Sequence, residues 1–83
     1  MRLAAEAEPT PFWTRDLDDD CTALWAGFTL RAERMDEGIW WWATYVDASK
    51  RQIASSNDAE VSPTTGEEAR AAAFRAARSF LYP

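Results

Sequence analysis

The sequence predicts an α+β domain in which a three-stranded antiparallel meander is covered on one face by a C-terminal helix (β-β-β-α). Three observations support this prediction. Residues 21–35 and 39–46 alternate in polarity and are rich in β-branched and aromatic side chains, which is typical of strands. A short glycine-containing segment separates them, and an alanine-rich amphipathic segment ends the chain. We therefore expect one domain at residues 21–83, preceded by an irregular acidic arm at residues 1–20.

The N-terminal arm, residues 1–20, shows no sustained period, and Pro9 and Pro11 interrupt any helix there. It contains six of the 14 acidic residues of the chain but only two arginines. We interpret it as a solvated charged segment, with a partner-facing acidic patch as the alternative. The arm ends in four aspartates that are the candidate acidic contacts: Asp16, Asp18, Asp19 and Asp20.

Residues 21–35 alternate so regularly that we predict a single half-buried strand. Its even-numbered positions, which include Leu24 and Phe28, are apolar and are expected to face the helix. Its odd-numbered positions then face away from the helix. The candidate binding residues among these are Trp25, Thr29 and Arg31.

The segment 36–38 (DEG) is typical of a three-residue hairpin loop whose glycine adopts the left-handed conformation. This loop places Ala32 opposite Trp42, so the apolar side of the first strand continues onto the second. Because successive side chains alternate, Trp41 and Tyr45 are expected on the opposite side. A two-residue loop would exchange the two faces. We favour three residues because apolar side chains then lie opposite one another.

Residues 52–57 are short and polar, which favours a strand at the edge of the sheet. Thr64, followed three residues later by Glu67, predicts a capping box that begins the helix, and the helix continues to about Leu81. The inner face of this helix is mostly alanine and therefore shallow. It needs large side chains opposite it, and the tryptophans predicted to face it, Trp40 and Trp42, supply them.

The residues needed for common catalytic sites are missing. The chain has no histidine, and its single cysteine, Cys21, can form no disulfide within the monomer and has no imidazole to activate it. We expect no metal site, no cofactor and no phosphate-binding glycine loop. We therefore predict that the protein is not an enzyme.

The net charge of −5 argues against binding to nucleic acid, which needs clustered lysine and arginine side chains. No apolar segment is long enough to span a membrane, and the N-terminus lacks the apolar core of a signal peptide. We expect a soluble cytoplasmic protein that is attracted to basic surfaces on a partner protein.

The face turned away from the helix combines Trp, Tyr and Arg, which are residue types enriched at binding hot spots. We predict a non-catalytic protein-binding module that engages a basic partner protein through this face and the acidic arm. Three alternatives stay open: the arm covers the face within one chain, a homodimer pairs through it, or the face stacks the bases of single-stranded nucleic acid on Trp41 and Tyr45. The candidate residues on this face are Trp25, Thr29, Arg31, Trp41 and Tyr45.

The segment TTGEEA at residues 64–69 lies between a predicted short sheet and a predicted helix. In outline, residues 40–81 resemble the small domain of HicB-type antitoxins, although the proline-containing second strand usual in that family is missing. In size, acidity and lack of catalytic groups, the chain is similar to small phage-encoded inhibitors such as anti-CRISPR proteins. Both resemblances imply an inhibitor or antitoxin that blocks a partner protein.

Overall fold

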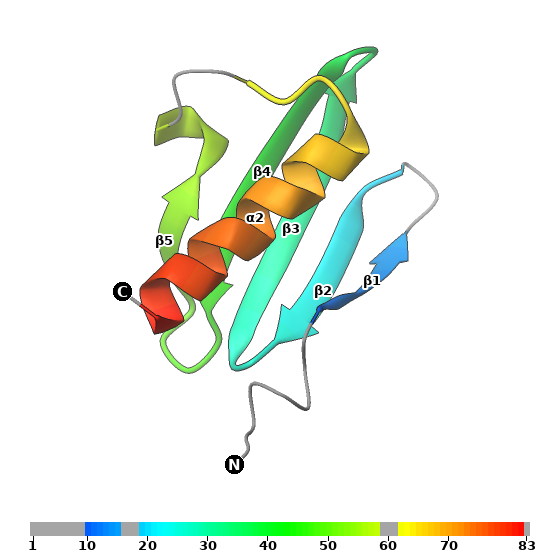
Figure 1. The fold of residues 1–83 in the computed structure, drawn as a ribbon. Helices are drawn as coiled ribbons and strands as arrows, with labels where there is room; N and C mark the ends of the chain where they lie inside the picture. Colours follow the sequence, from blue (N-terminus) through cyan, green and yellow to red (C-terminus); the bar gives the residue numbers. More distant parts are fainter. Residues whose placement is uncertain (1–9, 16–18, 59–61, 83) are drawn as a thin grey trace.

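The computed structural model describes residues 10–15, 19–58 and 62–82, and it shows one antiparallel sheet with a helix across one face (Figure 1). The five strands follow one another in the sheet in chain order, so the α+β class is confirmed, but the predicted number of strands is wrong. The elements are β1 (Phe12–Arg15), β2 (Cys21–Trp25), β3 (Phe28–Asp36), β4 (Ile39–Val46), β5 (Arg51–Ser55), a short 3-10 turn η1 (Ser56–Asp58) and helix α2 (Gly66–Leu81).

The predicted single strand over residues 21–35 is in fact a hairpin of β2 and β3. Ala26 and Gly27 have φ angles of 51° and 86°, so both residues of this two-residue turn are left-handed. Such a turn matches the twist of a hairpin and reverses the chain at once. It places Trp25 opposite Phe28. The inward-facing positions are therefore odd-numbered in β2 and even-numbered in β3.

Part of the expected irregular arm is also a strand. Residues Phe12–Arg15 form β1, which pairs antiparallel with β2 and lies at one edge of the sheet. Trp13 lies opposite Ala23 and packs against the buried core, so this edge strand is anchored by its inward-facing tryptophan. The interpretation of residues 1–20 as irregular is therefore wrong for β1, while residues 1–9 and 16–18 lie outside the described residues.

The pairing of β3 with β4 is the one predicted. Ala32 lies opposite Trp42, and Leu30 lies opposite Thr44. The loop itself differs from the prediction, because Asp36 already pairs with Ile39 and the extra residue is taken up by a β-bulge between positions 34 and 36. A bulge inserts one residue into one strand, so it preserves the register that a three-residue loop would have produced.

Helix α2 begins one residue later than predicted. Its N-cap is Thr65, whose hydroxyl oxygen accepts a hydrogen bond from the backbone N–H of Glu68 at 3.1 Å. The Glu68 carboxylate in turn accepts hydrogen bonds from the backbone N–H and the hydroxyl of Thr64, at 2.9 and 3.1 Å. These bonds favour the ionised carboxylate, the backbone bond most strongly, and hold the pKa of Glu68 below its ordinary value. The capping box is therefore present, shifted by one residue.

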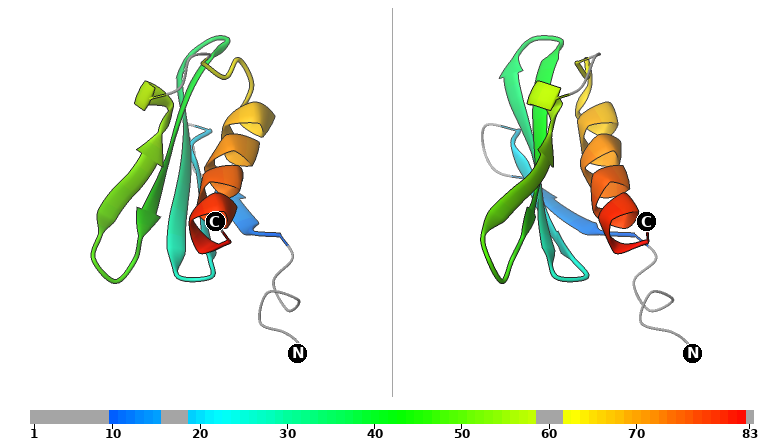
Figure 2. Two further views of the ribbon diagram at one scale, coloured as in Figure 1. Left: turned by 60° about the vertical axis from the view of Figure 1, so that its left-hand side comes forward. Right: turned by 90° about the vertical axis from the view of Figure 1, so that its left-hand side faces the viewer.

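The core lies between α2 and the sheet, which form two layers (Figure 2). Ala69, Ala73 and Ala77 are fully buried along one side of the helix, and large side chains from the strands fill the space beneath them, as predicted. The side chain of Thr44 is a polar group inside this layer. The hydroxyl of Thr44, on β4, donates a hydrogen bond of 2.8 Å to the backbone carbonyl of Ala73 and so links the sheet to the helix.

Candidate functional site

The candidate site is the face of the sheet opposite α2, which we call the outer face. Figure 2 shows α2 on the other side of the sheet, and within residues 10–15, 19–58 and 62–82 no helix covers the outer face. Cross-strand neighbours share a face, so the register places side chains from four strands on this surface. They include Phe12, Leu24, Thr29, Arg31, Trp41 and Tyr45.

Four of the five predicted face residues are found on the outer face. Thr29 lies opposite Tyr45, and Arg31 and Trp41 lie further along the same two strands. The hydroxyl of Thr29 donates a hydrogen bond to a carboxylate oxygen of Asp47, which ties β3 to the end of β4. The structure therefore brings these four predicted residues together.

The placement of Trp25 is wrong. Its side chain is only 3% exposed and lies in the core, where its ring packs against Phe28 at 6.4 Å and against Phe74 at 5.0 Å between centroids. The cause is the turn at Ala26 and Gly27, which reverses the parity of the strand. Trp25 is therefore a core residue of the inner face.

The prediction that Leu24 faces the helix is wrong, because the turn at Ala26 and Gly27 places it on the outer face, and Phe12 was not among the predicted face residues. Phe12 on β1 and Leu24 on β2 lie directly opposite each other and are 82% and 68% exposed. Leu24 also lies opposite Thr29, which lies opposite Tyr45, so these four side chains form one strip across four strands. We call Phe12, Leu24, Thr29 and Tyr45 the outer strip. The sequence signal for Leu24 was the Ala26-Gly27 pair, because a hairpin turn at these residues leaves Leu24 as an exposed apolar position of β2.

The centre of the outer face is neutral and well packed. Arg31 donates hydrogen bonds from Nε and Nη2 to Glu33, at 3.1 and 2.8 Å, and from Nη1 to the hydroxyl of Thr22 at 2.8 Å. Ala43, directly opposite Arg31, is fully buried although it belongs to the open face. The charge of Arg31 is thus satisfied within the chain, and the apolar surface that stays exposed lies towards Phe12 and Leu24.

Of the four predicted acidic contacts, Asp19 and Asp20 are described, whereas Asp16 and Asp18 lie outside the described residues. Asp20 accepts a hydrogen bond of 3.0 Å from the backbone N–H of Arg34. Asp19 forms a salt bridge of 3.7 Å with the guanidinium group of Arg34. Both aspartates are half-buried against β3. The structure therefore attaches this part of the acidic segment to the sheet.

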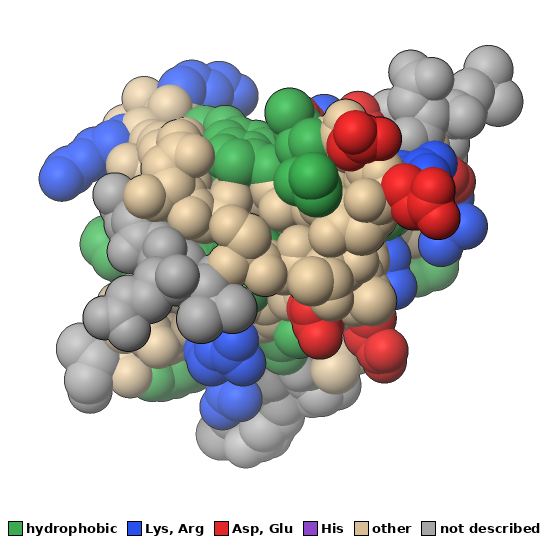
Figure 3. Space-filling model, turned by 90° about the horizontal axis from the view of Figure 1, so that it is seen from above, with side chains coloured by type: hydrophobic (Ala, Val, Ile, Leu, Met, Phe, Trp, Pro, Cys, Tyr) green, Lys and Arg blue, Asp and Glu red, His purple; other side chains and the backbone are tan. Residues whose placement is uncertain are grey.

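Several acidic side chains lie at the end of the molecule that holds the β3–β4 turn. Figure 3 looks onto this end, where acidic side chains lie beside exposed hydrophobic ones. Asp36 and Glu37 are exposed in the turn itself, and Glu33 lies opposite Trp41 on the outer face. Negative charge therefore borders one end of the outer face.

The described residues include Cys21 and acidic side chains, which are types that can hold metal ions or act as nucleophiles. Within them, no group of three His, Cys, Asp or Glu side chains is arranged to hold a metal ion. Cys21 is buried, donates from Sγ to the carbonyl of Asp19 at 3.5 Å and accepts from Nη1 of Arg70 at 3.7 Å. The same part of the chain contains no helix that is long and apolar enough to cross a membrane.

The chain matches no protein-family model, no curated protein and no solved structure. Its function is therefore inferred from the residues and geometry of the outer face.

Proposed function

We propose that the protein is a non-catalytic protein-binding module whose outer face receives a partner protein. The observation that carries this proposal is the pair Phe12 and Leu24, which lie opposite each other on an open sheet face and are both largely exposed. Contiguous apolar side chains on an uncovered face are typical of interaction surfaces. Trp41 and Tyr45 extend the same face with residue types that dominate binding energy at interfaces.

The free energy gained by covering one large aromatic side chain is large enough to support association. A large aromatic side chain buries roughly 150–250 Å² when it is covered, which at about 25 cal/mol per Å² favours binding by about 4–6 kcal/mol before entropic costs. Phe12 alone is mostly exposed and would contribute in this way. The neutral centre around Arg31 and Glu33 lets the partner approach without leaving an unpaired charge buried.

The partner in this proposal carries a basic surface. Asp36 and Glu37, both exposed in the β3–β4 turn, place negative charge at one end of the outer face, and the whole chain has a net charge of −5. Complementary charge of this kind steers a basic protein towards the apolar strip and sets its orientation. Whether binding blocks the partner, as in an inhibitor or an antitoxin, stays a prediction.

Two other proposals use the same face. A homodimer would pair two outer faces through Phe12 and Leu24, which suits an apolar strip without net charge. A single-stranded nucleic-acid binder would stack bases on Trp41 and Tyr45. We favour it least, because the guanidinium of Arg31 is already engaged by Glu33 and Thr22.

The test compares capture of partner proteins by three immobilised baits: the unmodified chain, Leu24→Glu and Ala71→Glu. Leu24→Glu adds one charge to the outer strip, whereas Ala71→Glu adds the same charge at an exposed position of α2. We expect the unmodified chain and Ala71→Glu to retain a basic protein that is released at high salt, and Leu24→Glu to lose it. Equal retention by all three baits would contradict the proposal.

Light scattering and an oligonucleotide titration separate the two other proposals. A mass of two chains that returns to one chain in Leu24→Glu supports the homodimer. Salt-dependent binding of a single-stranded oligonucleotide that is lost in Trp41→Ala supports nucleic-acid binding. Far-UV circular dichroism of each variant confirms that the fold is retained.

A further inference from the structure

The β3–β4 turn presents an apolar and acidic projection. Met35 and Ile39 are each more than half exposed, and they flank Asp36 and Glu37, which are also exposed. Asp36 and Ile39 pair with each other, so all four side chains extend from the tip of one hairpin. We call these four residues the hairpin tip.

The C-terminal half of α2 presents the opposite combination. A shallow groove there is lined by two aromatic residues, Phe74 and Tyr82, and by two arginines, Arg75 and Arg78. The guanidinium carbon of Arg78 lies 5.9 Å from the centre of the Phe74 ring. Both arginines and Tyr82 are exposed. We call these four residues the helix groove.

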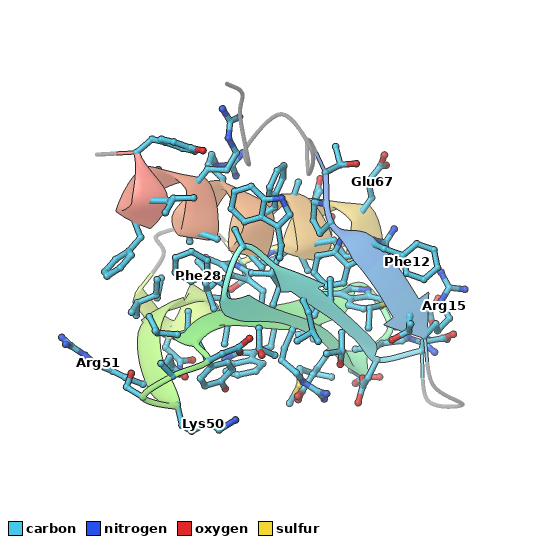
Figure 4. All side chains as sticks on the ribbon, turned by 90° about the horizontal axis from the view of Figure 1, so that it is seen from below. Phe12, Arg15, Phe28, Lys50, Arg51 and Glu67 are labelled. Atoms are coloured by element: carbon cyan, nitrogen blue, oxygen red, sulfur yellow. The ribbon has the colours of Figure 1, made fainter. Side chains whose placement is uncertain are left out.

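Further positive charge lies on the same side of the molecule as the helix groove. Figure 4 shows Lys50 and Arg51 projecting from the β4–β5 turn on the side where α2 ends, with Glu67 at the other end of the helix. Glu67 and Glu68, both exposed, begin α2 close to the β3–β4 hairpin. Four basic side chains therefore lie at the end opposite the hairpin tip: Lys50, Arg51, Arg75 and Arg78. Near the tip, the guanidinium group of Arg34 is paired with Asp19.

The hairpin tip and the helix groove cannot meet within one chain. Trp40, next to the tip, donates a backbone hydrogen bond of 3.2 Å to Pro63, which holds the tip near the start of α2. Phe80, near the end of α2, packs on Phe28 at the other end of β3, with 5.7 Å between ring centroids. A strand rises about 3.4 Å per residue, so the nine residues of β3 separate these two ends by roughly 27 Å.

We propose that the hairpin tip of one chain docks into the helix groove of a second copy. Asp36 and Glu37 then meet Arg75 and Arg78, and Met35 and Ile39 cover the exposed ring atoms of Phe74 and Tyr82. The contact joins two different surfaces, so it links chains head to tail. It uses neither Phe12 nor Leu24, and it is therefore independent of partner binding at the outer face.

The size of the contact makes the association weak and salt-dependent. The molecule measures 42 × 26 × 21 Å, and a hairpin tip covers only part of one of its smaller sides. Interfaces that bury less than about 1,200 Å² in total belong to the transient class. Exposed charges are screened beyond about 10 Å at 0.1 M salt, so the contact forms at high protein concentration and low ionic strength.

The first experiment measures the mass of the unmodified chain by sedimentation velocity over a wide concentration range, at low and at high salt. We expect the mass to rise above that of one chain at low salt and to return to it at high salt. Leu24→Glu should behave in the same way, because it alters the outer face alone. A single-chain mass at every concentration, or loss of association in Leu24→Glu, would overturn the proposal.

The second experiment uses two charge-reversal variants. Asp36→Lys with Glu37→Lys makes the tip basic, and Arg75→Glu with Arg78→Glu makes the groove acidic. Each double variant alone should have the mass of one chain, because its tip and groove then carry like charges. An equimolar mixture should regain the association, because the acidic tip of one variant meets the intact basic groove of the other.

This mixture distinguishes docking from damage to the fold. Two misfolded variants cannot restore each other, so recovery in the mixture supports the contact between tip and groove. If both variants retain the far-UV circular dichroism spectrum of the unmodified chain and their mixture stays monomeric, the proposal is wrong. Unchanged association in either variant alone would also contradict it.

Discussion

Leu24 and Trp25 are neighbours in β2, but Trp25 is buried and Leu24 is exposed. Trp25 is sealed beneath α2 between two phenylalanines, whereas Leu24 points to the outer face beside Phe12. Both residues are strongly apolar. The difference therefore comes from the geometry of the β2–β3 turn, which assigns odd positions of β2 to the core. Burial here follows strand parity, and the hydrophobicity of each residue does not decide it.

The largest expected effect on stability tests directly which positions of β2 face the core. Trp25→Ala should lower the free energy of unfolding by about 3–5 kcal/mol, because it removes a buried aromatic side chain and leaves a cavity. Leu24→Ala should change it by no more than about 0.5 kcal/mol, because the leucine is exposed. Urea denaturation of both variants measures the two values. The reverse order would support a continuous strand over residues 21–35.

A second prediction compares two threonines that both donate to backbone carbonyls. Thr44→Val removes the buried hydroxyl that bonds to Ala73, and we expect a loss of about 0.5–1.5 kcal/mol. Thr14→Val removes an exposed bond to the carbonyl of Thr22, which water replaces, so its effect should be close to zero. Thermal unfolding followed by circular dichroism gives both values. Equal losses of stability in the two variants would mean that water reaches the hydroxyl of Thr44 between the sheet and α2.

A third prediction concerns the turn that separates the two faces. Ala26 adopts a left-handed φ of 51°, a conformation that costs an alanine more than an asparagine. Ala26→Asn should therefore stabilise the fold by about 0.5–1 kcal/mol, which corresponds to a rise in Tm of several degrees for a domain of this size. Ala48→Asn, in the β4–β5 turn, has no such strain to relieve and serves as the control. A lower Tm in Ala26→Asn would contradict the hairpin.

The smallest expected effect lies on the exposed surface of α2. The folded-state pKa of Glu68 lies below its ordinary value of 4.5, so its ionised form stabilises the folded chain. This contribution is present above the ordinary pKa and is lost as the pH falls through the lowered folded-state pKa. Thermal unfolding measured from neutral to acidic pH should therefore show that the Tm of Glu68→Gln depends less on pH than the Tm of the unmodified chain. Glu67→Gln removes the same charge one position away but leaves the hydrogen bonds between Glu68 and Thr64 in place, so the pH dependence that comes from Glu68 should persist.

Much of the candidate site was predictable because its residues belong to a long hairpin. The pairing of β3 with β4 follows from apolar side chains lying opposite one another over many residues, so Thr29, Arg31, Trp41 and Tyr45 were assigned to the correct face. Trp25, Phe12 and Leu24 were not. Their positions depend on a turn made by Ala26 and Gly27, which carries only half of the Asn-Gly signal that marks such turns in a sequence.

The amino-acid sequence by itself determined the fold class, the pairing of β3 with β4, the burial of Trp42 and the capped, alanine-faced helix. Each of these depends on local periodicity or on contacts between elements adjacent in the chain. Only the tertiary structure decided that β1 joins the sheet and that residues 21–35 divide into two strands. Both outcomes depend on the space beneath α2, which Trp13 and Trp25 fill together with the other core side chains. A local pattern cannot show this space, because it exists only once the helix lies on the sheet.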